Sequence, residues 1–299
     1  MPTLTTRLHT VTLALVLVSI LCAGAPFAEE KSADEIAKEL SNPAGSLSSL
    51  NNNIQYTTFK GDIPGADSQD TWSYVFQPVL PFAVGNKGHR IIFRPAFSVP
   101  INQPVFKAGK GEFEDLDVNL GDTTFDLVYA GTQMTDKVNK KGYLWGLGVA
   151  GTLPTATNNA LGGDQWRAGP EVFGGILRPW GLVGALVNNQ WNLGGGDGGP
   201  GSNDQDYSVM TAQYFYAYGL GKGWQISSSP IITYDAKADS DEAWTVPVGI
   251  GVAKTTKLGN KPWKFQFQVQ KYVEQPDAFG PEWLFKLTIT PVINNPFTK

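Results

Sequence analysis

The stretch WKFQFQVQKY, residues 263–272, alternates apolar and polar side chains over most of its length. Successive side chains of a β-strand point to opposite faces, so the alternation predicts a strand with one apolar face, including Phe267, and one polar face, including Gln268. In a soluble sandwich these faces contact a protein core and water. In an outer-membrane barrel they contact lipid and a wet lumen. The local pattern is the same in both cases, so the rest of the chain has to distinguish them.

The composition of the 299-residue chain is unusual for a soluble domain. Charged residues make up 17 % and aromatic residues 12 %, whereas soluble domains typically carry about 25 % charged residues. The net charge of −4 gives no basic footprint, so we expect no nucleic-acid partner. No apolar run reaches the roughly 18 residues that a membrane helix needs. The composition therefore favours a barrel over a helical membrane protein.

Residues 1–28 have the pattern of a secretory signal peptide. Arg7 precedes the apolar stretch VTLALVLVSILCAGA, which is followed by small residues. We predict cleavage after Ala28, with cleavage after Ala25 as an alternative. Lipidation of Cys22 is a further alternative, although Leu21 stands where a small residue is expected. Because Cys22 is the only cysteine, a mature chain cut after Ala28 has no disulfide and no zinc–thiolate site.

Residues 29–50 are predicted to form a periplasmic leader with a short helix. In SADEIAKELSNP, residues 32–43, Ser32 and Glu35 have the spacing of a capping box, and Pro43 should end the helix. Two interpretations stay open. The leader is either partly ordered, or its helix acts as a periplasmic plug or docking element.

Residues 51–293 contain twelve strand-like segments, most of them 9–14 residues long. A tilted strand needs about 9–11 residues to cross a bilayer, whereas soluble strands usually have about 5–6. Short links follow the even segments and longer loops follow the odd ones, as in outer-membrane barrels. We therefore predict an all-β fold: a single antiparallel transmembrane β-barrel of about 12 strands, with a short N-terminal helix and a C-terminal tail, residues 294–299. The segments are 51–59, 71–82, 89–99, 119–131, 142–153, 165–178, 180–193, 206–219, 223–235, 243–256, 262–273 and 282–293.

Tryptophan and proline add two further expectations. All nine tryptophans lie near segment ends, at two levels that are typical of interfacial aromatic girdles. Six prolines fall inside the predicted strands. A closed barrel has no free edge, so each should mark a bulge or a local break in the hydrogen-bond ladder. These prolines are Pro78, Pro95, Pro170, Pro230, Pro247 and Pro291.

The polar strand faces supply the candidate lumen. Arg94 and Asp126 lie on neighbouring segments at similar depth, so they are predicted to pair and to narrow the pore. Their role is either this mutual neutralisation or direct contact with solute. A layer at mid-height, which also includes Glu171, Gln268 and Lys286, is the predicted constriction. The lumen-lining candidates are Arg90, Arg94, Asp122, Asp126, Arg167, Glu171, Lys264, Gln266, Gln268, Gln270 and Lys286.

The sequence contains few residues that could form a catalytic or metal-binding site. His89 is the only histidine after residue 28, and it lies beside a short turn at the predicted periplasmic rim. A twelve-stranded phospholipase would need its Ser–His pair near the external leaflet, so we expect no enzyme. The acidic loop DAKADSDE, residues 235–242, has oxygen ligands but not the spacing of a known calcium loop. We expect a solvated loop there, with no metal and no cofactor.

Several strings resemble a known family. They are ELSNPAGSL, QPVLPF, GPEVFGGILRPWGLVGALVNNQW, WTVPVGIGVAKTTKLGNKPW and PEWLFKLTITPV, spread over most of residues 39–293. The chain resembles outer-membrane barrel proteins labelled transporter or "MetA-pathway of phenol degradation". The resemblance implies a porin-like outer-membrane transporter for small molecules, with aromatic or hydrophobic compounds as candidate solutes. A structural or adhesive barrel with a blocked lumen is the alternative. The expected partners are outer-membrane lipid, lipopolysaccharide, a small-molecule solute and the barrel assembly machinery.

Overall fold

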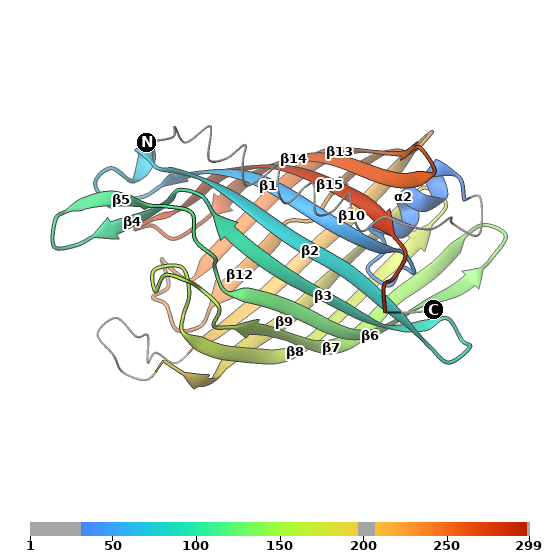
Figure 1. The fold of residues 1–299 in the computed structure, drawn as a ribbon, viewed down its shortest axis with the longest axis horizontal. Helices are drawn as coiled ribbons and strands as arrows, with labels where there is room; N and C mark the ends of the chain where they lie inside the picture. Colours follow the sequence, from blue (N-terminus) through green and yellow to red (C-terminus); the bar gives the residue numbers. More distant parts are fainter. Residues whose placement is uncertain (1–30, 197–206, 298–299) are drawn as a thin grey trace.

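The computed structural model describes residues 31–196 and 207–297. Within these ranges the chain forms a closed antiparallel barrel of twelve long strands, one of them split in two (Figure 1). β1 (Ser48–Lys60) pairs with both β2 (Asp70–Val84) and β15 (Gly280–Ile293), so the first and last strands meet. The predicted fold class is confirmed. The other unbroken strands are β3 (His89–Pro100), β6 (Thr123–Asp136), β7 (Lys141–Leu153), β8 (Gln165–Arg178), β9 (Gly181–Gly195), β10 (Ser208–Gly221), β13 (Trp244–Leu258) and β14 (Lys261–Glu274).

The two faces of the strands answer the question raised by residues 263–272. Phe267 is 51 % exposed on the outside of the barrel, whereas Gln268 is only 1 % exposed. Apolar side chains on other strands are exposed in the same way, among them Leu147 and Ile250, both 61 % exposed. Soluble monomers rarely expose an apolar surface of this extent. The outer face therefore has the character of a lipid-contacting surface.

The two ends of the barrel differ in their connections. Short turns join β2 to β3, β6 to β7, β8 to β9, β10 to the next strand, and β13 to β14. Longer segments connect the strands at the opposite end. Short turns face the periplasm in outer-membrane barrels, so this end is called the periplasmic end below, and the opposite end is called the external end.

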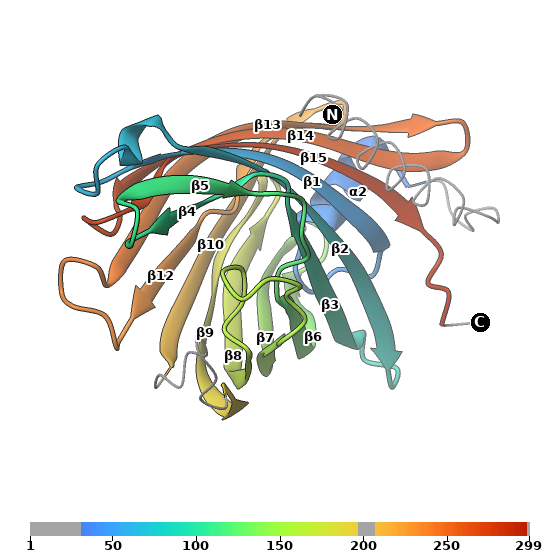
Figure 2. The same cartoon turned by 60° about the vertical axis from the view of Figure 1, so that its left-hand side comes forward.

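The longest external connection carries structure that the sequence did not predict. Residues 100–118 were expected to be a plain loop, but they contain a hairpin of β4 (Gln103–Lys107) and β5 (Glu112–Leu116). The hairpin projects from the external end (Figures 1 and 2). Phe113, near the turn of the hairpin, packs against Phe279 of another external loop, with ring centroids 4.8 Å apart. The connection between β1 and β2 also contains the short 3-10 helix η1 (Ala66–Ser68).

All six prolines predicted to disturb the strands lie where the ladder is interrupted or shifted. Pairing between β2 and β3 skips the residues around Pro78 and Pro95. Pairing between β8 and β9 skips Pro170, and pairing between β15 and β1 skips Pro291. The register between β13 and β14 shifts next to Pro247. Because proline lacks the N–H that a ladder needs, each break follows from the residue itself.

Pro230 has the largest effect and corrects the predicted ninth strand. The segment expected at 223–235 is divided into β11 (Trp224–Ser228) and β12 (Ile231–Asp235). β13 pairs with β11 only as far as Ile226 and resumes pairing with β12 at Thr233. Residues 227–232 and 246–251 therefore face each other without ladder hydrogen bonds over about 20 Å. We call this interruption the seam.

The leader is ordered and lies inside the barrel. α2 (Ala33–Ser41) has the predicted capping box between Ser32 and Glu35, and Asn42 is its C-cap. The helix sits within the periplasmic end of the barrel (Figures 1 and 2). β1 starts at Ser48, three residues before the predicted start. No helix within the described ranges is long and apolar enough to cross a membrane. The predicted signal peptide, residues 1–28, lies outside the described residues.

Part of the barrel interior is apolar. A buried cluster fills the side formed by β3 and β6 to β10 and includes Ala44 of the leader. Phe173 from β8 lies over Gly146 of β7, where an added Cβ atom would be 2.1 Å from the ring. Phe215 from β10 lies over Gly184 of β9 in the same manner. Strand alternation predicted a polar inner face for several strands, and it did not predict this apolar side.

Candidate functional site

A cavity of about 610 Å³ lies inside the barrel, and we call it the central cavity. The leader from Glu39 to Leu47 forms part of its boundary, and inward-facing side chains of the strands form its walls. Barrels of about eight strands are filled by side chains, whereas those of 16–18 strands hold an aqueous channel. Here a lumen of intermediate width is partly filled by the leader. Polar residues that line the cavity include Asn51, Asn53, Gln55, Asn188, Gln190, Gln213, Thr288 and Thr290.

A charged layer crosses one side of this cavity. Arg94 on β3 and Asp126 on β6 are register partners, and the Arg94 guanidinium lies 3.0 Å from the Asp126 carboxylate. The predicted pair is therefore formed. The same guanidinium lies 3.6 Å from Glu171 on β8, which is fully buried and also accepts a hydrogen bond from Asn188 at 3.2 Å. Sequence reasoning placed Glu171 at this level but missed its contact with Arg94.

Two lysines occupy the opposite part of the wall. Lys264 on β14 is 8 % exposed, and its ammonium donates a hydrogen bond to Ser41 Oγ of the leader at 3.0 Å. Lys286 on β15 also lines the cavity. Within the described ranges, no carboxylate lies within ion-pair distance of either ammonium group.

Two glutamines of β14 reinforce the seam. The Gln268 carbonyl accepts hydrogen bonds from Ser228 Oγ at 2.9 Å and from the Ser229 backbone N–H at 3.2 Å. Gln266 donates to the carbonyl and hydroxyl oxygens of Ser227. Both side chains reach β11 across β13, where Gly251 leaves room for Gln268. These glutamines therefore stabilise the wall as well as lining the cavity.

Tyrosines reinforce the seam from β10. The Tyr214 hydroxyl donates to the Pro247 carbonyl at 3.1 Å, and the Tyr216 hydroxyl donates to the Gly249 carbonyl at 2.9 Å. Both tyrosines lie on the face of β10 opposite Phe215. The backbone groups freed by the missing ladder are thus partly satisfied by side chains, as a buried or lipid-facing backbone requires.

The remaining predicted residues lie away from the centre of the cavity. Asp122 borders it, but its carboxylate accepts hydrogen bonds from Ala156 and Gly163 N–H and so holds the loop between β7 and β8. Gln270 is 2 % exposed and packs where a Cβ atom on Gly249 would lie. Arg167 stacks over Tyr207 at 3.9 Å. Arg90 lies at the periplasmic end and donates to Ala44 O and Gly88 O.

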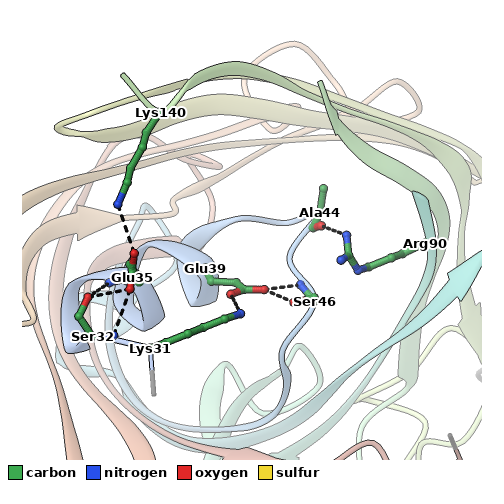
Figure 3. A network of polar contacts seen from close by, with 8 residues as sticks. All are labelled: Lys31, Ser32, Glu35, Glu39, Ala44, Ser46, Arg90 and Lys140. Carbon is green, nitrogen blue, oxygen red and sulfur yellow. Dashed lines mark hydrogen bonds and ion pairs between the residues drawn. The ribbon is translucent and has the colours of Figure 1, made fainter. Parts of the chain in front are cut away.

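Polar contacts fix the leader to the periplasmic end, and two of them, to Lys140 and to Arg90, are drawn in Figure 3. The Asp34 carboxylate accepts hydrogen bonds from the Lys222 N–H at 3.1 Å and the Gly223 N–H at 2.6 Å. Lys38 donates to the Arg178 carbonyl at 2.5 Å. Sequence reasoning identified the helix but could not identify these partners, because they lie in a distant turn and at the end of a distant strand.

Two glutamates on the helix carry shifted pKa values. The backbone N–H of Ser32 and the ammonium of Lys140, 3.2 Å away, hold the pKa of Glu35 below its usual value. Burial raises the pKa of Glu39, but its contacts with Lys31 and Ser46 outweigh that effect and lower it overall (Figure 3). Both groups are therefore carboxylates at neutral pH, and both hold the leader in its observed shape.

A second cavity, the rim cavity, lies between the leader and the opposite wall. Its volume is about 470 Å³, and it is lined by leader residues together with Arg90, Thr132, Met134 and Leu177. Glu39, Asn42 and Gly45 border both cavities. The leader is therefore the partition between the central cavity and the rim cavity. Within the described ranges, no three histidine, cysteine or acidic side chains lie together in a way that could hold a metal ion.

Comparison with known proteins supports the architecture. No model of a known protein family matches the sequence, and no curated protein is a match. Among solved structures, the chain is similar to an outer membrane channel from Pseudomonas putida, with a TM-score of 0.58 and 15 % sequence identity. The match covers 83 % of this chain and 94 % of that chain.

At this identity the likeness shows the fold alone. The chain has the fold of an outer-membrane β-barrel channel, which agrees with its closed sheet, apolar outer face and internal cavity. The resemblance to the phenol-degradation family stays a prediction.

Proposed function

We propose that this protein is a channel of the bacterial outer membrane for the passive passage of small molecules. The observation that carries the proposal is the central cavity inside a closed barrel with an apolar outer face. The resemblance noted in the sequence adds aromatic or hydrophobic compounds as the candidate solutes. Residues 1–28 are removed on export in this proposal, and lipid, lipopolysaccharide and the assembly machinery are its expected partners.

The interior suits small solutes with an apolar part. Polar walls keep the cavity wet, while Leu182, Leu186 and Phe215 present an apolar surface to the same space. The layer formed by Arg94, Asp126 and Glu171 narrows the cavity and sets the local potential, because charges in a lumen control which ions pass. The leader then controls passage to the rim cavity.

Planar-bilayer recordings of the parent protein and of Arg94→Ala, Asp126→Ala and the double variant test this proposal. We expect single-channel conductance in the parent and an altered cation-to-anion ratio in each single variant. Gln77→Ala, which changes an uncharged residue lining the same cavity, is the matched control and should leave the ratio unchanged. If all three charge variants keep the parent conductance and ratio, this layer is not the constriction.

A structural or adhesive barrel is the second candidate, favoured by the leader inside the lumen and by the projecting β4–β5 hairpin. The same recordings separate it from a channel. Absence of current in the parent and in Asp34→Ala, which loosens the leader, would favour the structural role. Mass determination of the mature protein tests the predicted cleavage after Ala28.

A further inference from the structure

The wall formed by β14, β15 and β1 presents hydrogen-bond donors to the central cavity. Thr288 Oγ1 donates to Asn53 Oδ1 and Thr290 Oγ1 donates to Asn51 Oδ1, both at 2.8 Å. The amide oxygens of these asparagines are therefore occupied by threonine hydroxyls, and their amide groups remain as donors. The Asn53 amide donates a hydrogen bond to the Val75 carbonyl at 3.1 Å. The Asn51 amide lies at the cavity surface, where it can donate to a solute.

The ammonium groups of Lys264 and Lys286 lie on this same wall. Lys286 is the register partner of Gln268, and Lys264 lies four residues from Gln268 along β14. The two lysines are therefore about 13 Å apart along the strands. Lys286 lies near mid-height and Lys264 lies beside the leader. Burying most of an ammonium group without a counter-charge costs free energy. An anion bound at this wall would offset that cost.

The acidic groups of the cavity do not supply that counter-charge. Asp126 and Glu171 both contact Arg94. β6 is separated from β15 by β1, β2 and β3, which places the acidic layer about 19 Å away around the wall. Glu39 is engaged by Lys31 at 2.6 Å. The register partners of Lys286 on the two neighbouring strands are the uncharged amides Gln55 and Gln268.

The opposite side of the cavity is apolar. Leu182, Leu186 and Phe215 line it from β9 and β10. One side of the same cavity thus offers positive charge and donors, and the other offers apolar surface. Ligand sites of this kind bind a solute through one polar group and bury its apolar remainder.

We propose that the central cavity binds amphipathic organic anions, with the carboxylate of the solute at Lys286 and then at Lys264 and its apolar or aromatic body against Leu182, Leu186 and Phe215. This inference rests on the proposed function, because it assigns a substrate class to the same cavity. It adds that the preferred solute carries a negative charge.

Calorimetric titration of the protein purified in non-ionic detergent tests the inference, with benzoate, benzyl alcohol and benzylammonium as probes of similar shape and different charge. We expect benzoate to bind the parent at least about tenfold more tightly than the other two, since a hydrogen bond to a charged group contributes at least that factor. Lys286→Gln should remove this preference and Lys286→Arg should keep it. Lys271→Gln is the matched control, because Lys271 pairs with Glu282 outside the cavity.

Lys286 contacts no leader residue in the hydrogen bonds and ion pairs of the described ranges, so its substitution tests the anion site without releasing the leader. Equal affinity of the parent for benzoate and benzyl alcohol would overturn the inference, as would unchanged benzoate affinity in folded Lys286→Gln. Uptake of benzyl alcohol into proteoliposomes tests the proposed function separately. Uptake without a benzoate preference refutes the anion site alone, whereas benzoate binding without passage of any probe refutes the channel alone.

Discussion

The wall from β6 to β8 and the wall from β10 to β14 close the same barrel in different ways. β6, β7 and β8 are joined by ladders that run almost their full length. At the seam the ladder is replaced by hydrogen bonds that Gln266, Tyr214 and Tyr216 donate and that Gln268 accepts. We call the wall from β6 to β8 the continuous wall and the wall from β10 to β14 the interrupted wall. α2 packs mainly against β10 and β13, while the rim cavity lies toward the continuous wall. The leader therefore packs mainly on the interrupted wall, and Lys38 and Glu35 also tie it to Arg178 and Lys140 of the wall from β6 to β8.

Both walls use glycine to admit a side chain from the next strand. Gly146 in the continuous wall makes room for Phe173, and Gly251 in the interrupted wall makes room for Gln268. The admitted side chain is apolar where the backbone is already paired. It is polar where proline has left backbone groups without partners. The difference teaches that a barrel tolerates a broken strand when side chains from neighbouring strands can reach the freed groups.

The largest expected effect compares the two walls at matched lipid-facing sites. Leu147→Arg and Ile250→Arg each place a charge at a position that is 61 % exposed on the outer face. Each should lower the free energy of unfolding by about 2–4 kcal/mol, as measured by denaturant titration in lipid vesicles. Gln77→Arg, directed into the cavity, is the control and should cost much less. A clearly smaller loss for Ile250→Arg would mean that the seam is hydrated.

Removing a side chain that bridges the seam should have the next largest effect. Gln268→Leu leaves the Ser229 N–H and the Ser228 hydroxyl without their acceptor. The expected loss is about 1–3 kcal/mol, because a buried donor without a partner costs its full desolvation energy. Hydrogen exchange should become faster at Ser229 and not in β7. Gln77→Leu, at a position with no hydrogen bond to lose in the described ranges, should be nearly neutral. Equal losses of unfolding free energy in the two variants would show that Gln268 does not stabilise the seam.

The tyrosine hydroxyls should contribute less. Tyr214→Phe and Tyr216→Phe each remove one hydrogen bond to a β13 carbonyl and keep the ring. Each should lower the free energy of unfolding by about 0.5–1.5 kcal/mol. Tyr143→Phe in the continuous wall is the control, because its exposed hydroxyl makes no hydrogen bond in the described ranges. If Tyr143→Phe lowers the free energy of unfolding as much as Tyr216→Phe does, the tyrosine hydroxyls of β10 do not specifically stabilise the seam.

The smallest effect concerns the leader and pH. The pKa of Glu35 is lowered in the folded protein, so its contribution to leader stability is present above its ordinary pKa and is lost as the pH falls through the lowered value. Glu35 is exposed, so solvent screening keeps this contribution small. Acidification should slightly increase protease cleavage of the leader in the parent but not in Glu35→Gln. An identical pH response in both proteins would assign the effect to Glu39 or another group.

The sequence by itself determined the architecture and the central ion pair. Alternation has a period of two and is local, so it predicted which side chains of each strand face lipid, as Phe267 and Gln268 illustrate. Short turns restrict the register between neighbouring strands. This restriction is why strand direction and alternation are enough to place Arg94 opposite Asp126. The positions of the prolines predicted where the ladders break, because the missing N–H belongs to the residue itself.

Only the tertiary structure decided which distant groups meet inside the barrel. Glu171 reaches Arg94 across two intervening strands, Gln268 reaches Ser229 over Gly251, and Asp34 of the leader meets the turn at Gly223. Closure of the sheet and the space left by glycines create these contacts, and neither is encoded in local periodicity. The apolar interior around Phe173 has the same origin, since strand alternation distinguishes the two faces but does not reveal what fills a closed barrel.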